Sequence, residues 1–253
     1  MSSNVTVLNN PIKEITYNIE NDEELIKYEI ANPITNINIT LKENTKCSMI
    51  IFENEDLKAS VNVNVELKEN SNFKLYNVIT TSNNVEINIM CYMNEINSSF
   101  ESLNVVLASD ESNYHSYIDV KHNAKNTNSN VEVYAIAKDN AKITLDNNAT
   151  IKKGCSKTIA HQKAKGLTLN KNSVIKALPN LFIDEYDVIA NHAASIGSLN
   201  PEDLFYLMSR GLTKEEASKI IIMGFITPLI ECVNDEEIKK MILNNFMEKS
   251  NLK

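Results

Sequence analysis

The sequence predicts a mainly β protein, in which a parallel β-helix is followed by a small C-terminal α-helical domain. Three features favour this fold class: a recurring pair of Asn and a small residue, segments of alternating apolar and polar residues, and helical patterns after residue 198. The pairs are Asn44-Thr45, Asn70-Ser71, Asn97-Ser98, Asn123-Ala124, Asn148-Ala149 and Asn172-Ser173. Their nearly even spacing along the chain predicts stacked coils with a shared core, because so short a repeat cannot bury its own apolar side.

The residues beside the pairs support the repeat. Three positions before each Asn, five of the six residues are apolar, and the same holds three positions after it. Between the pairs, apolar residues alternate with polar ones, as in Ile37, Ile39 and Leu41. This period of two is typical of strands with one buried face. An antiparallel meander with Asn at ordinary turns is the alternative, but it would repeat at a shorter interval.

The corners between strands are predicted to rely on Asn. The chain has only five glycines, and Asn is the other residue that tolerates left-handed backbone angles. Stacked Asn side chains at equivalent corners can also hydrogen-bond along the axis. Cys47 lies at an inward position of this pattern, which predicts a core residue.

The domain boundaries follow from the changes in pattern. Residues 1–30 form a short lead-in to which no structure is assigned, residues 31–197 form the β-helix, and residues 198–253 form the helical domain. Asn200 followed by Pro201 predicts the start of a helix, and Gly211 its end. Thr213 with Glu216 forms a capping box that opens a second helix.

The rest of the helical domain is less regular. Pro228 is expected to end or kink the second helix, and Asn234 with Glu237 opens a third. Three such helices bury little alone, so we expect them to pack on the last coils or on a partner, where they would cover open strand edges.

Composition excludes several classes of function. A net charge of −8 and the absence of Trp argue against a nucleic-acid partner. Neither a secretory signal nor an apolar stretch long enough to span a membrane is visible, so no membrane association is expected. The four cysteines are scattered, which favours reduced thiols and a cytoplasmic location.

The C-terminal third carries a dense set of motifs. They are Leu178-Pro179-Asn180-Leu181-Phe182-Ile183, Asn191-His192-Ala193-Ala194-Ser195-Ile196-Gly197, Asp203-Leu204-Phe205-Tyr206-Leu207-Met208-Ser209-Arg210-Gly211 and, upstream, His161-Gln162. Over residues 160–231 the chain resembles the SufB/SufD family, the scaffold subunits of the Suf machinery for iron–sulfur cluster assembly. The chain is most similar to the compact single-scaffold type.

The resemblance implies a right-handed parallel β-helix, pairing of two such subunits through their β-helices, here as a homodimer, and a transient iron–sulfur cluster. It also implies that the C-terminal helices dock on SufC, an ATPase of the ABC type. Two positions depart from the SufB pattern. Lys163 stands where SufB has Cys, and Ala193 stands where SufB has Glu, so the chain is closer to SufD and cluster ligation by this chain alone is in question.

Three residues are candidate metal ligands. His192 matches the SufD interface histidine and is the first candidate, because an imidazole can bind iron through one nitrogen. Asp187 is a weaker oxygen donor, with a turn acid as the plainer interpretation. Cys155 offers a thiolate, the ligand that iron–sulfur clusters prefer, although a buried core thiol is the simpler interpretation.

The partner-binding residues are expected in the family's helical block. They are Leu204, Phe205, Tyr206, Arg210 and Gly211. Arg210 is the only arginine of the chain, and its alternative role is a favourable charge at a helix C-terminus.

The sequence contains no catalytic signature such as Gly-x-Ser-x-Gly, His-Glu-x-x-His or a phosphate-binding Gly loop. We therefore expect a scaffold that is not an enzyme, with ATP hydrolysis left to its partner. Two alternatives stay open: a degenerate member that binds the ATPase but no cluster, and a polysaccharide-binding β-helix, for which a groove of carboxylates and aromatics would be expected.

Overall fold

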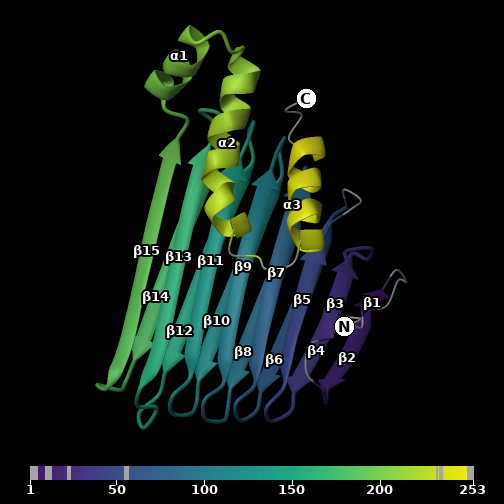
Figure 1. Ribbon diagram of the computed structural model, residues 1–253, viewed down its shortest axis with the longest axis vertical. Helices are drawn as coiled ribbons and strands as arrows, with labels where there is room; N and C mark the ends of the chain where they lie inside the picture. Colours follow the sequence, from purple (N-terminus) through teal and green to yellow (C-terminus); the bar gives the residue numbers. More distant parts are fainter. Residues whose placement is uncertain are drawn as a thin grey trace.

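The computed structural model describes residues 5–8, 13–21, 24–53, 57–231, 233 and 236–249. Its strands pair in parallel and alternate between two facing sheets, so the predicted parallel β-helix is confirmed (Figure 1). The odd sheet contains β1 (Val5–Leu8), β3 (Glu24–Glu29), β5 (Lys46–Phe52), β7 (Asn72–Thr81), β9 (Ser99–Ala108), β11 (Asn128–Ala137), β13 (Thr158–Thr168) and β15 (Val188–Ser198). The even sheet contains β2 (Glu14–Ile19), β4 (Ile34–Leu41), β6 (Ala59–Leu67), β8 (Val85–Met93), β10 (Asn113–His122), β12 (Lys142–Ile151) and β14 (Val174–Ile183).

The coils lengthen toward the C-terminal end of the β-helix. In the first coil Val5 pairs with Leu25, whereas in a late coil Asn147 pairs with Pro179, so the later coil contains many more residues. Because the coils grow in this way, a repeat of fixed period drifts out of register with the fold.

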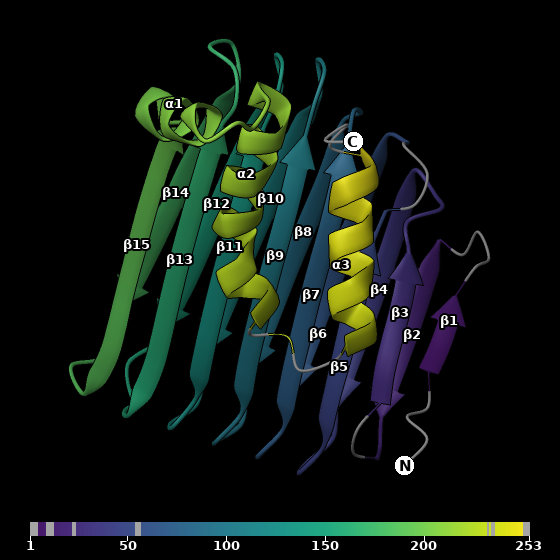
Figure 2. The same cartoon turned by 45° about the horizontal axis from the view of Figure 1, so that its top comes forward.

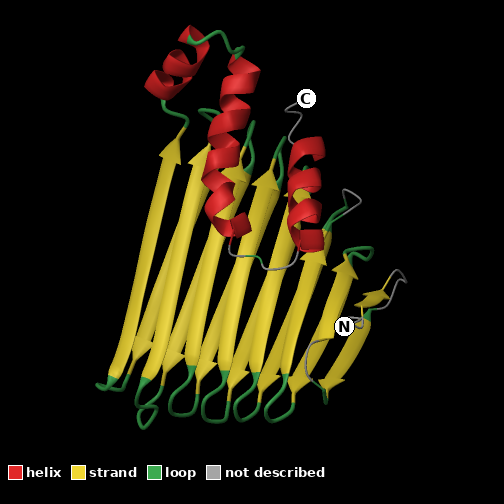
Figure 3. Ribbon diagram, viewed as in Figure 1, coloured by secondary structure: helices red, strands yellow, loops and turns green. Residues whose placement is uncertain are grey.

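The corners after β4, β6, β8, β10 and β12 use left-handed residues, as predicted. Asn44, Asn70, Asn97 and Asn126 have positive φ, and Lys157 takes the same conformation in the next coil. The spacing between these positions widens along the chain, as the coils do. Figure 3 shows the short loops that connect the strands at both ends of the coils.

The stacked corners are joined by side-chain hydrogen bonds. The Nδ2 of Asn70 donates to the Oδ1 of Asn44 at 2.8 Å, and the Nδ2 of Asn97 donates to Asn70 at 2.9 Å. The last three Asn pairs of the predicted repeat do not continue this ladder. Asn123 precedes the left-handed residue of its corner by three positions, and Asn148 lies inside β12. Asn172 lies in the loop between β13 and β14, at the opposite corner of the coil, so the predicted register was wrong there.

Residues 1–30, to which no structure was assigned from the sequence, contribute three strands. β1 and β3 extend the odd sheet and β2 extends the even sheet. Ile15, Ile19, Ile26 and Tyr28 are buried in the same core as the later coils. These coils are too short for the Asn repeat, which explains why that repeat did not reveal them.

The core between the sheets consists of columns of side chains in register. One column runs through Leu41, Leu67, Met93, His122 and Ile151. Cys47 belongs to this core, as predicted. His122 is the polar member of the column, and its side chain is fully buried.

The buried imidazole is held by two hydroxyl groups. The Nδ1 of His122 lies 2.8 Å from Thr127 Oγ1, and its Nε2 lies 2.9 Å from Ser129 Oγ. In the neutral ring one nitrogen donates and the other accepts, so both hydroxyls can bond to it. Burial lowers the pKa of His122 to about 4, because the charged ring would lose its hydration.

This depressed pKa makes stability depend on pH. Between pH 6.5 and 4 the unfolded chain binds a proton at His122 that the folded protein does not bind, so stability falls as the pH falls. From pH 7 to pH 5 we expect this residue to cost about 2 kcal/mol of unfolding free energy. Urea denaturation at both pH values measures the loss.

The matched variant is His122→Met, because Met93 fills the same column one coil earlier. At pH 7 we expect it to lose about 1–2 kcal/mol, since Thr127 and Ser129 lose a partner. Between pH 7 and pH 5 the unfolding free energy of this variant should fall less than that of wild type, because the variant lacks the titrating imidazole. Equal pH slopes in both proteins would contradict the assignment.

Three helices follow the last strand: α1 (Pro201–Ser209), α2 (Lys214–Glu231) and α3 (Glu236–Lys249). The expected caps are present. Asn200 Oδ1 accepts from the Glu202 N–H at 3.1 Å, and Gly211 has a φ of 95°. The Thr213 hydroxyl accepts from the Glu216 N–H, while the Glu216 carboxylate accepts from the Thr213 N–H.

Of the two effects expected of Pro228, an end of the helix is ruled out, because α2 continues past this residue to Glu231. The predicted cap Asn234 lies outside the described residues. In the described part of the chain, no helix is both long enough and apolar enough to cross a membrane.

The helices pack elsewhere than expected. α2 and α3 lie across the outer face of the odd sheet, where Ile222, Ile226 and Phe246 are buried against Tyr76 and Tyr134 (Figure 2). They do not cover the edges of the last coil, which was the expected position. Their apolar side chains find a partner in the outward apolar rows of β7, β9 and β11.

Candidate functional site

The last coil leaves one end of the β-helix open. Within the described residues, β14 pairs only with β12 and β15 pairs only with β13, so one edge of each strand has no neighbour. Apolar side chains are exposed on this coil, among them Phe182 and Ile189, the latter at 60%. Unpaired edges with exposed apolar residues are surfaces on which another chain can pair.

His192 lies at this open end, on the inner face of β15. Its register partner is Gln162. Ala190, two residues before it, packs against the core. Ile196, four residues after it, also faces inward, because a Cβ built on Gly166 would lie 3.2 Å from the Ile196 side chain. Because strand side chains alternate between faces, His192 shares the inward face with both, and its imidazole is exposed only because no further coil covers it.

Gln162 makes the inner face at this end polar. Its side chain is almost fully buried, and its Nε2 reaches across the core to the carbonyl oxygen of Asn180 in β14, at 3.4 Å. Its Oε1 is buried without a hydrogen-bond partner among the described residues. An unpaired amide oxygen is costly in a core. Its position beside His192 therefore suits a site in which another molecule supplies the missing hydrogen-bond donor.

The other two candidate ligands do not join His192. Asp187 lies in the corner before β15, five residues from His192, which corresponds to about 16 Å along an extended chain. Cys155 is buried with Ala149, Ile151 and Ala160, and burial raises the pKa of its thiol. In the described part of the chain, no three His, Cys, Asp or Glu side chains converge as a metal site.

Lys163 lies on the outer face of β13, next to Gln162. Its Nζ is 3.1 Å from Glu132 and 5.6 Å from the centre of the Tyr134 ring. Hydrogen bonds to Tyr134 and to Glu132 raise the pKa of Lys163. The side chain therefore holds a positive charge at the position where SufB proteins are expected to place a thiolate.

This lysine also borders the contact between the sheet and the helices. Phe225 of α2 packs edge-on against Tyr134, with ring centres 5.6 Å apart, and Lys165 lies over the same ring. The outer hollow beside it has a volume of about 500 Å³ and is lined by Glu132, Lys163 and Asn191 among others. No sequence signal pointed to Glu132, because it lies one coil before Lys163 in the chain.

The five predicted partner-binding residues lie on or next to α1. This helix has no buried residue, and Phe205 and Tyr206 are 75% and 57% exposed. The Arg210 guanidinium lies 5.3 Å from the centre of the Tyr206 ring. Leu204 is half-buried, and Gly211 ends the helical block. The helix thus presents an apolar surface near the open end (Figure 1).

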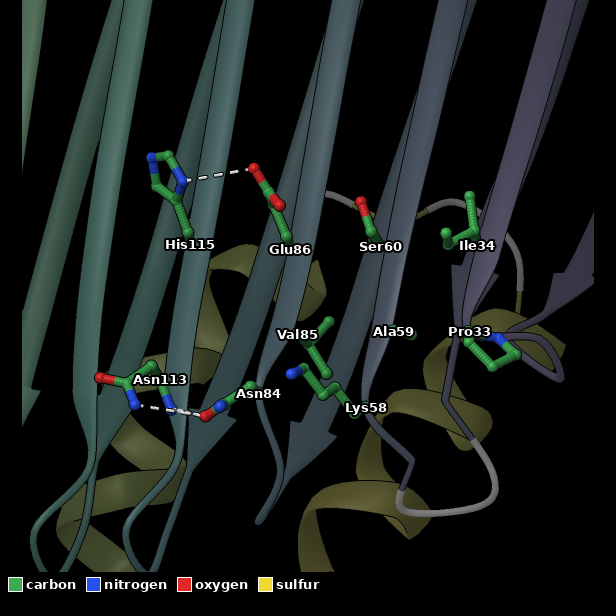
Figure 4. A pocket seen from close by; sticks show the side chains of 10 residues that line it. All are labelled: Pro33, Ile34, Lys58, Ala59, Ser60, Asn84, Val85, Glu86, Asn113 and His115. Carbon is green, nitrogen blue, oxygen red and sulfur yellow. Dashed lines mark hydrogen bonds and ion pairs between the residues drawn. The ribbon is translucent and has the colours of Figure 1, made fainter.

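A second hollow, larger than the first, lies far from these residues. It has a volume of about 760 Å³ and opens on the outer face of the even sheet, near His115 and Glu86 (Figure 4). None of the predicted site residues lines it.

Comparisons with known proteins identify the family. The family described as "SUF system FeS cluster assembly, SufBD core domain" matches residues 5–225. The iron–sulfur cluster assembly protein SufD of Bacillus subtilis is 40% identical over 111 residues, which cover 44% of this chain and 25% of that protein. SufD of Escherichia coli is 28% identical over 124 residues, or 49% of this chain and 29% of that protein.

A more distant relative matches more of the chain. SufD of Plasmodium falciparum is 24% identical over 215 residues, which cover 85% of this chain but 14% of that protein. This chain therefore aligns with less than a third of the length of these curated relatives. The family match itself spans every described strand together with α1 and part of α2. The chain belongs to the SufBD family of the SUF system for iron–sulfur cluster assembly.

Proposed function

We propose that this chain is a non-enzymatic, cytoplasmic scaffold subunit that pairs through its open end with a second, identical SufBD-type subunit. The observation that carries the proposal is the last coil: each of its two strands has an edge without a pairing strand among the described residues, beside exposed apolar side chains. Pairing would bury Phe182 and Ile189 and would supply neighbours for the free backbone groups of β14 and β15.

An ABC-type ATPase of the SufC kind is the proposed partner of α1. The exposed rings of Phe205 and Tyr206 form an apolar patch, and Arg210 is held over one of them. Aromatic residues and Arg are the side chains most often found at the energetic centre of protein interfaces. Leu204 and Gly211 lie at the two ends of this patch in the sequence.

The cargo is proposed to be a nascent iron–sulfur cluster at the paired ends. One chain offers His192 on the inner face but no group of three ligands among the described residues. Two chains meeting at their open ends would bring two such imidazoles to one interface. Asp187 and Cys155 are not proposed as ligands, because one lies in a distant corner and the other is buried.

The ATPase can act on this interface through α2. Its contact with the sheet runs through Phe225 and Tyr134, and the same ring contacts Lys163 next to the open end. Nucleotide-driven closure of two bound ATPases would pull on both helical domains and rearrange the paired coils. Opening would then admit iron and sulfide.

A second function is supported by Lys163. Its positive charge, paired with Glu132, disfavours a metal cation on the outer face of β13. A member that binds the ATPase without carrying a cluster would have no use for a thiolate there. The two functions differ in whether His192 binds a cluster.

Anaerobic reconstitution with iron and sulfide tests the choice. We expect the wild-type protein to gain the visible absorption of a cluster and His192→Ala to lose most of it. His115→Ala is the matched control, because that histidine lies on the outer face of the even sheet, and it should behave as wild type. Equal absorption in wild type and His192→Ala would remove His192 as a ligand, and no absorption in either would favour the member without a cluster.

A further inference from the structure

The larger hollow crosses the outer face of the even sheet on the side opposite the helices. It lies at the start of β4, β6, β8 and β10 and has a volume of about 760 Å³, which is within the range of small-molecule sites. One row of paired positions runs through it: Ile34, Ser60, Glu86 and His115. The hollow forms because Ser60 is small between the larger Ile34 and Glu86 (Figure 4).

One side of the hollow is apolar. Pro33 and Ile34 form the wall at β4, and the Ile34 side chain is 59% exposed. Ala59 and Val85 form the floor of the hollow through their backbone, because their side chains belong to the core between the sheets. This side can accept a hydrocarbon or aromatic body that displaces water from the exposed isoleucine.

The other side presents mainly hydrogen-bond donors. Asn84 Oδ1 already accepts from the backbone N–H and the Nδ2 of Asn113, at 2.9 and 3.2 Å, which leaves the Nδ2 of Asn84 to donate. Lys58 is exposed, has no ion pair within the described residues, and points toward Asn84 in Figure 4. The Glu86 carboxylate faces the His115 ring at 3.7 Å, so the one acidic group among the described lining residues already has a neighbour.

We propose that this hollow binds a small amphipathic organic anion, a carboxylate on an apolar or aromatic body. The body would lie against Pro33 and Ile34, and the carboxylate would accept from the Lys58 ammonium and the Asn84 amide. A charge-assisted hydrogen bond from an ammonium is stronger than one between neutral groups, so the negative head decides the selectivity. The proposal is independent of the scaffold function, because the hollow is distant from the open end and from α1.

Titrations with 2-naphthoate and with neutral 2-naphthamide, followed by ligand NMR on the whole protein, test it. For wild type we expect saturable binding, with the anion bound roughly five- to tenfold more tightly than the amide. Lys58→Gln should remove that preference while the amide affinity stays the same. Ser60→Phe should fill the hollow and abolish binding of both compounds.

The controls keep the test decisive. Lys171→Gln removes an exposed lysine in a distant corner and should leave both affinities unchanged. Aromatic residues are favoured on strands, and Ser60 lies on the outer face, so Ser60→Phe should fold, as its thermal melting will show. Absence of saturable binding to wild type, equal binding of acid and amide, or full binding to Ser60→Phe would each overturn the proposal.

Discussion

Replacing Phe73 by alanine is expected to lower the free energy of unfolding by about 3–5 kcal/mol. The ring is fully buried between the two sheets and stacks on Phe100 of the next coil, with ring centres 6.2 Å apart. Removing it leaves a cavity between two coils, and in a solenoid each coil depends on its neighbours for its core. Urea denaturation followed by circular dichroism measures the loss.

Phe205→Ala is the matched control for this substitution. The same side chain is removed, but from an exposed position on α1, so we expect a change within about 0.5 kcal/mol. Similar losses for the two variants would mean that the Phe73 column does not hold the coils together.

Substituting Ile189 by lysine is expected to convert the proposed dimer to a monomer. In the proposed pair this side chain is buried at the edge of β15, where an unpaired ammonium would be costly. In the isolated chain the residue is exposed, so folding should be little affected. Sedimentation velocity across a range of concentrations gives the oligomeric state.

Ile96→Lys provides the comparison for this edge variant. Ile96 is also exposed, but it lies in the corner between β8 and β9, away from the open end. We expect it to remain a dimer with the mass of wild type. If Ile189→Lys also stays dimeric, the last coil is not the pairing surface.

The sequence predicted those features that depend on the conformational preference of a few neighbouring residues. Alternating residues identified the strands, since each buries one face, and Asn44, Asn70 and Asn97 identified corners because few other residues adopt left-handed angles. Caps at Asn200 and Thr213 were equally local. These features depend on neighbours within a few positions, so they can be read without the fold.

The long-range arrangement was harder to predict because the coils change length. An evenly spaced repeat predicts corners at Asn123 and Asn148 after the one at Asn97. In the structure, Asn148 lies inside β12. The true spacing of the corners widens after Asn97, so the apolar column continues through His122 rather than Val120. His122 is polar, so the apolar pattern of the sequence did not mark it as a member of this core column.

The candidate site was predicted only in part. His192 came from the family motif, the structure places it on the last coil, and its role as a ligand stays a prediction. Glu132 and Asn180 were missed, because they approach Lys163 and Gln162 from other strands and only the coil lengths decide which residues meet. The position of α2 and α3 also depended on outward apolar rows that the alternation pattern had not separated from the core.

The most direct test of the scaffold account is the mass of the complex with a SufC-type ATPase, measured by light scattering after gel filtration. The account predicts co-elution of two scaffold chains with two ATPase chains. Phe205→Asp should abolish that complex while the scaffold itself stays folded and dimeric, whereas Ile96→Lys should bind as wild type does. A wild-type chain that elutes alone at every ATPase concentration, with or without nucleotide, would contradict it.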